Sequence, residues 1–197
     1  MRRIVLSAFL LLATGGSAFC QAPPGGAPPG GPRPPPLMLS SPAIQDGGMV
    51  PDKYTAASQS PVTPPLTWTN IPATAQSLVL IVHDADVVVQ RGMGDNPHWI
   101  VFNIPPTTAS LAEGLPSTPA LPDGSVQLSR KNGQGVVTGV GYFPFAPPPG
   151  FVHHYNFDLY ALDTKLPLDT NASRADVESA MAGHVVGKAV LETRFKR

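Results

Sequence analysis

The sequence predicts an all-β fold: an antiparallel β-sandwich with a C-terminal helix and long proline-rich loops. The 197-residue chain holds 25 prolines and 19 glycines, and proline is excluded from helix interiors, so a helix bundle or coiled coil is ruled out. Hydrophobic residues make up 42% of the chain, enough for one domain with a real core. Short apolar or alternating segments are separated by turn signals, which is the pattern of a sandwich.

Three segments carry the clearest strand patterns. Residues 77–84 (SLVLIVHD) are almost continuously apolar, which indicates a strand buried on both faces. Residues 98–104 (HWIVFNI) repeat this pattern and end at two prolines. Residues 153–162 alternate, which places His153, Tyr155, Phe157 and Leu159 on one face. Weaker strands are predicted at 66–69, 136–140 and 188–195.

One helix is predicted after residue 172. Ser173 can cap its first turn, and Asp176 stands three residues later, as in a capping box. Its apolar face is predicted to consist of Val177, Ala180, Met181 and His184. Gly183 is the expected stop signal.

Residues 1–20 have the organisation of a signal peptide. Two arginines precede an apolar run from Ile4 to Ala13, which is too short to cross a bilayer core of about 30 Å, and small residues follow. Cleavage is expected after Ala18 or Cys20, giving a periplasmic or secreted protein with no transmembrane segment in the mature chain. Lipidation of Cys20 is the alternative, but the bulky Phe19 disfavours it.

The remaining chain divides into a spacer and one domain. Residues 21–37 are rich in proline and glycine and hold almost no side chain that could build a core, so they are predicted to be an extended spacer. Residues 38–197 form the folded domain. The 13 basic and 13 acidic residues cancel, which gives no reason to expect a nucleic-acid partner. The single cysteine excludes an intrachain disulfide.

Four motifs occur in order along the domain. They are SPVTPPLTW at 60–68, HDADV at 83–87, the HW pair at 98–99, and GYFPFAPPPGFVHHYNF at 141–157, which is followed by LYALD. Together they resemble the phosphatidylethanolamine-binding protein family, in its bacterial Raf-kinase-inhibitor-like branch, over residues 39–197. The resemblance implies an antiparallel β-sandwich with a small anion-accepting pocket at one edge. It implies no cofactor and no common enzymatic activity.

The resemblance also implies the pocket residues. The matching positions are Asp84, Asp86, His98, Pro147, His153 and Tyr155. The chain departs from the family pattern at Ala85, Ala146 and His154, and at Phe143-Pro144-Phe145, where glycines are usual. The two phenylalanines are expected to narrow the pocket mouth or make it more apolar.

The residue types themselves suggest an anion site. Asp84 and Asp86, two apart at a strand end, are expected to share a face, as are His153 and Tyr155. Histidines beside carboxylates hold their protons more readily, so His98 and His153 are expected to donate to a phosphate or carboxylate oxygen. The nearby acids make the pocket almost neutral, so we expect modest affinity. A purely structural hydrogen-bond network is the alternative.

Two other functions stay open from the sequence. The first is a protein-interaction module that inhibits a protease or signalling enzyme through the loops Val87–Asn96 and Ala112–Val126. The second is a weak hydrolase in which Asp84 orients His153 as a base. A metal site from the histidines is not expected, because the neighbours His153 and His154 point to opposite faces of a strand. The oligomeric state is left open.

Overall fold

The computed structural model describes residues 34–87, 95–131 and 134–197. The predicted signal peptide, most of the spacer and most of the loop Val87–Asn96 lie outside the described residues. The folded unit spans Pro35–Arg197. It begins close to the predicted boundary, and Leu37 already lies in its core.

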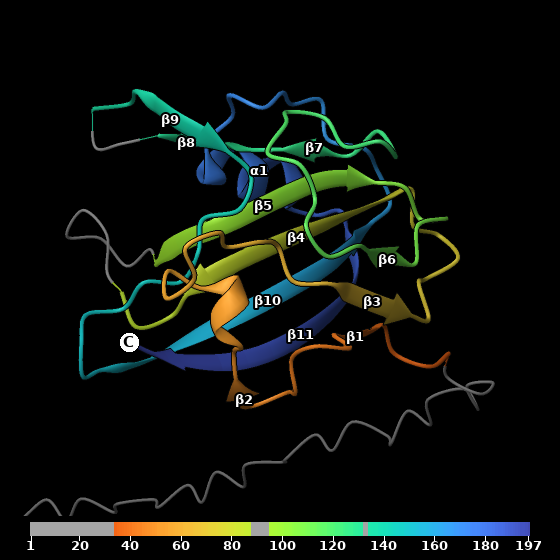
Figure 1. Cartoon of the computed structure of the whole chain (residues 1–197). Coiled ribbons are helices and arrows are strands. Elements are labelled where there is room, and N and C mark those ends of the chain that lie inside the picture. Colours follow the sequence, from red (N-terminus) through yellow and green to blue (C-terminus); the bar gives the residue numbers. More distant parts are fainter. Residues whose placement is uncertain (1–33, 88–94, 132–133) are drawn as a thin grey trace, which may run out of the picture. The chain divides into compact units, whose positions relative to one another are not determined.

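A six-stranded sheet is the centre of this unit (Figure 1). In spatial order its strands are β2 (Gly48–Met49), β11 (Val185–Lys196), β10 (Val152–Leu162), β4 (Ser77–Asp84), β5 (Asn96–Ile104) and β7 (Val126–Gln127). Neighbouring strands are antiparallel, except that β2 runs parallel to β11. Tyr155 of β10 stands opposite Asp84 of β4 on one side and Thr193 of β11 on the other.

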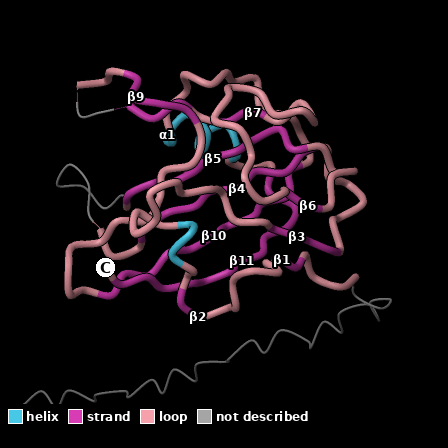
Figure 2. The backbone as a smooth tube through the Cα atoms, in the orientation of Figure 1, coloured by secondary structure: helices cyan, strands magenta, loops and turns pink. Residues whose placement is uncertain are grey.

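A smaller sheet faces this one and completes the sandwich. It consists of β1 (Met38–Ser40), β3 (Leu66–Thr69) and β6 (Ser110–Leu111). The main core lies between the two sheets and includes Trp68 of β3, Trp99 of β5 and Phe157 of β10. A separate hairpin of β8 (Ser129–Lys131) and β9 (Val137–Val140) and a short 3-10 helix, η1 (Asp52–Tyr54), complete the described elements (Figure 2).

The helix α1 (Arg174–Met181) covers the other face of the large sheet. Val177 and Met181 of α1 pack with Ile81 of β4 and Phe102 of β5 in a second core cluster. Strand β4 is therefore buried along its whole length, as its apolar run predicts. The predicted capping box is confirmed, with reciprocal hydrogen bonds between Ser173 and Asp176.

The predicted helix face is wrong at its last member. Helix α1 ends at Met181, and His184 lies beyond it, where it is exposed and bonds Asp163 at 2.8 Å. Gly183 adopts a φ of +83°, a conformation that ends the helix and turns the chain into β11.

The all-β antiparallel sandwich is confirmed. The strands predicted at 66–69 and 77–84 coincide with β3 and β4, whereas β11 extends beyond the predicted 188–195 at both ends. The short strands β1, β2, β6, β7 and β8 were not predicted, because two or three residues carry no readable alternation. None of the helices in the described ranges is long and apolar enough to cross a membrane.

Candidate functional site

A β-bulge brings His98 to the inter-sheet face. Val82 stands opposite Trp99 and His83 stands opposite Pro97, so His98 is the extra residue between two pairs. Strand alternation alone would send the neighbours His98 and Trp99 to opposite faces. With the bulge, the His98 ring packs against Tyr155 and Phe145 while Trp99 stays in the same core.

Asp84 and His153 form the polar centre of the candidate site. His153 Nδ1 lies 2.8 Å from Asp84 Oδ2, and the side chains are 12% and 4% exposed. The other oxygen of Asp84 accepts from the backbone N–H of Asp86 at 3.0 Å. Each oxygen of the Asp84 carboxylate therefore has one partner. The contact through Nδ1 holds the imidazole ring of His153, and Asp84 does not contact its Nε2 atom.

His98 is a neutral wall of the site at neutral pH. Its Nδ1 donates to the carbonyl oxygen of Phe143 at 2.8 Å, and its Nε2 accepts from Asn96 Nδ2 at 3.3 Å. Burial is the main cause that lowers the pKa of His98 below its usual value. The lowered pKa disfavours a charged His98 at neutral pH, because desolvation outweighs the attraction of Asp84. The ligand contact expected for His98 stays a prediction.

Tyr155 carries the most unusual group of the site. Its side chain is fully buried, with the ring stacked on Phe145 at 3.9 Å between centroids. Its hydroxyl is buried and makes no hydrogen bond in the described part of the chain. Burial, followed by the negative charge of Asp84, raises the pKa of Tyr155 well above its usual value. The hydroxyl is thus neutral. No partner among the described residues meets hydrogen-bond geometry, although the Asp84 carboxylate lies near enough to contribute to the raised pKa. Tyr155 shares a face with His153 as predicted.

Asp86 does not share the face of Asp84. Strand β4 ends at Asp84, so the alternation rule stops there, and Asp86 lies in the turn that follows. Its carboxylate accepts from the backbone N–H of His154 at 2.6 Å and lies 2.9 Å from His154 Nδ1. Partial burial raises the pKa of Asp86, but the hydrogen bonds from His154 outweigh it, and the net pKa lies below its usual value. Pro147 is buried in the connection to β10, and its ligand contact stays a prediction.

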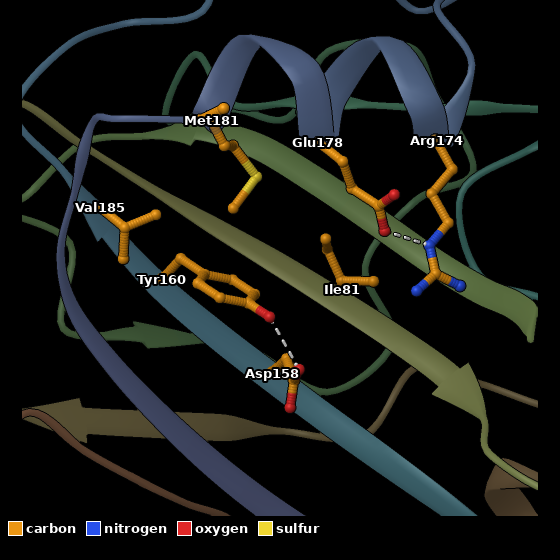
Figure 3. Close-up of a pocket in the computed structure, with 8 residues that line it drawn as sticks. Ile81, Asp158, Tyr160, Arg174, Glu178, Met181 and Val185 are labelled. Atoms are coloured by element: carbon orange, nitrogen blue, oxygen red, sulfur yellow. Dashed lines mark hydrogen bonds and ion pairs between the residues drawn. The ribbon is translucent and has the colours of Figure 1, made fainter. Parts of the chain in front are cut away.

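A second polar cluster lies on the opposite face of the sheet, beneath α1 (Figure 3). Asp158 Oδ2 accepts from the Tyr160 hydroxyl and from Lys188 Nζ, both at 2.9 Å. Burial raises the pKa of Asp158, but the hydrogen bonds from His83, Lys188 and Tyr160 prevail and set it at about 2.

The same cluster ties α1 to the sheet. Arg174 of α1 binds Asp95, which also contacts His83 of β4. A cavity of about 280 Å³ opens beside Asp158 and Tyr160, with Met181 and Val185 at its apolar end. The sequence interpretation missed this cluster, since its members come from five separate segments and no motif joins them. In the described ranges, no group of three or more histidine, cysteine or acidic side chains is arranged to hold a metal.

Comparisons with known proteins give one consistent result. The sequence model of the family described as phosphatidylethanolamine-binding protein matches residues 40–196. A protein of Methanothermobacter thermautotrophicus, named UPF0098 protein, is 42% identical over 159 residues, which cover 81% of this chain and 98% of that protein. LppC of Mycobacterium tuberculosis, whose name describes it as a lipoprotein, is 36% identical over 82% of this chain and 73% of its own.

A solved structure agrees with these relatives. The crystal structure of a homologue of phosphatidylethanolamine-binding proteins from Chlamydia trachomatis superposes with a TM-score of 0.68 at 35% identity. The match covers 82% of this chain and 98% of the other.

Proposed function

Because the chain belongs to the phosphatidylethanolamine-binding protein family, whose members are in general binding proteins, we propose that it is an exported binding protein for a small anion. The site is the cluster of Asp84, His98, His153 and Tyr155. The ligand is a phosphate or carboxylate group, either free or as the head group of a larger molecule. The observation that carries the proposal is the buried, unpartnered hydroxyl of Tyr155 beside His153.

Each residue has a distinct role in this proposal. Tyr155 donates its hydroxyl hydrogen to a ligand oxygen, which satisfies a group that is costly to leave unpaired. Asp84 holds His153 through Nδ1, so a protonated His153 presents its second N–H to the ligand. His98 is fixed by the Phe143 carbonyl and shapes the wall without adding charge.

Isothermal titration at pH 5 and pH 8 tests this proposal. Inorganic phosphate, phosphoethanolamine and acetate are the probes, which separates free phosphate, a lipid head group and a carboxylate. His153→Ala is expected to weaken phosphate binding at pH 5 by about 1.5–3 kcal/mol, the worth of a hydrogen bond to a charged group. His184→Ala is the matched control, because His184 is exposed and paired with Asp163 outside the site. Equal affinity in wild type and His153→Ala would show that the cluster is structural.

Export is supported by the N-terminal sequence pattern and by the lipoprotein name of one relative. A mature chain that starts near Phe19 or Gln21 is expected, and a lipid-modified Cys20 is the alternative. Intact-mass analysis of the native protein distinguishes the two. A chain that retains Met1 and stays inside the cell would contradict both.

A weak hydrolase is the second candidate. A histidine that acts as a general base needs a carboxylate to orient its ring, and Asp84 lies 2.8 Å from His153 Nδ1. Turnover of p-nitrophenyl phosphate or p-nitrophenyl acetate that disappears in His153→Ala would support it. The interaction-module alternative depends on the loop Val87–Asn96, most of which lies outside the described residues, and on Ala112–Val126. A pull-down from the exported proteome tests it.

A further inference from the structure

The candidate site contains no permanent positive charge of its own. His153 faces the carboxylate of Asp84, His98 is neutral at neutral pH, and Asp86 faces His154. An anion that approaches this cluster therefore meets carboxylates as well as donors. Anion binding at neutral pH is favoured by a cation that no carboxylate already neutralises.

Arg130 is such a cation, and it contacts Phe143, which in turn contacts His98 of the candidate site. Arg130 lies in β8, and its guanidinium carbon sits 5.4 Å from the centroid of the Phe143 ring. The Phe143 ring in turn stacks on His98, with centroids 5.4 Å apart and planes 21° from parallel. The backbone carbonyl of Phe143 also fixes His98 Nδ1. One residue therefore joins the arginine to the wall of the candidate site.

The position of Arg130 is built into the β8–β9 hairpin. Arg130 stands opposite Gly139 in the strand register. A Cβ atom added at Gly139 would lie only 2.1 Å from Arg130 Nη2. Gly139 has no positive φ, so its backbone conformation does not require glycine. The room it leaves is filled by the guanidinium group, which fixes the direction of the arginine side chain.

In the described part of the chain the guanidinium rests on the Phe143 ring but forms no ion pair. Its Nε atom is buried without a hydrogen bond. Across the described ranges no carboxylate lies within ion-pair distance of Arg130, and all 13 acidic residues of the chain fall in those ranges. A half-buried guanidinium without an anion loses hydration and gains no ion pair in exchange. The group is thus ready to accept an anion, and its planar fork suits phosphate and carboxylate oxygens.

We propose that Arg130 is the cationic residue that recognises the anion at the candidate site, and that Phe143 is the positioning residue that holds it there. This inference rests on the proposed function and names the source of its charge. The cavity beneath α1 offers no comparable cation, because Arg174 and Lys188 are already paired with Asp95 and Asp158.

The test measures the dissociation constant of inorganic phosphate and of phosphoethanolamine at pH 8, for wild type, Arg130→Gln and Lys131→Gln. Arg130→Gln is expected to weaken both ligands about tenfold or more, since it removes a charge-assisted contact. Lys131→Gln removes the same charge one residue away and is expected to change affinity less than twofold. A loss for phosphoethanolamine alone would contradict a shared phosphate contact.

Two further readouts separate a binding role from a structural one. Phe143→Leu is expected to weaken phosphate binding several-fold at unchanged protein charge. In the wild-type chain, the ¹⁵Nε resonance of Arg130 is expected to shift as phosphate is added, which keeps the inference testable if Arg130→Gln fails to fold. Wild-type binding with no effect of Arg130→Gln and no shift of this resonance would overturn the inference and leave the proposed function standing. Absence of binding in wild type would overturn the proposed function itself.

Discussion

Replacement of Tyr155 by phenylalanine is expected to stabilise the unliganded protein. The Tyr155 hydroxyl is buried and has no hydrogen-bond partner in the described chain, and a group of this kind costs about 1–3 kcal/mol of folding free energy. Phenylalanine keeps the ring stacked on Phe145 and removes only one oxygen atom. Allowing for the small void left behind, the expected gain is about 1 kcal/mol, or about 2–4 °C in Tm for a domain of this size.

Urea unfolding followed by the fluorescence of the buried Trp68 and Trp99 measures this gain, in buffer free of phosphate and carboxylates. Tyr142→Phe is the matched control. The Tyr142 hydroxyl is buried too, but it donates to the backbone oxygen of Tyr54 at 2.6 Å. That variant is expected to lose about 1 kcal/mol, the net worth of an ordinary hydrogen bond.

The comparison of the two variants decides between a binding site and a structural network. A binding site predicts opposite signs, because Tyr155 is held ready for a ligand at a cost in stability. A loss in Tyr155→Phe as large as that in Tyr142→Phe would refute the reasoning. It would mean that the hydroxyl bonds Asp84 in solution and that the cluster serves the fold.

Three further predictions concern stability. Asp158→Asn is expected to lower the unfolding free energy by about 1–2 kcal/mol at pH 7. The pKa of Asp158 is about 2 in the folded protein and about 3.9 in an unfolded chain, so the charged carboxylate stabilises the fold above about pH 3.9. Unfolding measured at pH 7, 4 and 3 should show the difference between the two proteins shrinking as the pH falls, and a constant difference would contradict this. Ser173→Ala is expected to cost about 1 kcal/mol through loss of the α1 cap, measured by urea unfolding, and no change would mean that the cap is not used. Deletion of residues 22–36 is expected to leave the unfolding free energy within about 1.4 kcal/mol, since the segment offers little apolar surface to bury, and a larger loss would show that it packs on the domain.

Local patterns in the sequence were sufficient for the main strands and the helix start. The apolar run of β4 reflects burial of that strand on both faces. The capping box of Ser173 reflects hydrogen bonds within the first turn of α1. The stop at Gly183 was expected, but His184 was wrongly assigned to the helix face, since the spacing of the face continues past the glycine that turns the chain.

The candidate site was only partly predictable, because some of its features depend on contacts between distant segments. The shared face of His153 and Tyr155 follows from strand alternation. The orientation of His98 does not, because it depends on a bulge that is defined by the partner strand. The neutral state of His98 depends on its burial beneath Phe143. The role inferred for Arg130 depends on its hairpin partner Gly139, nine residues away. These are tertiary effects that no local pattern records.

A crystal structure of the protein with phosphoethanolamine tests the central claim most directly. We expect the phosphate group within hydrogen-bond distance of the Tyr155 hydroxyl and His153 Nε2, with the guanidinium of Arg130 on another of its oxygens. A phosphate group bound elsewhere, with the Tyr155 hydroxyl still unpartnered, would contradict the assignment of this site.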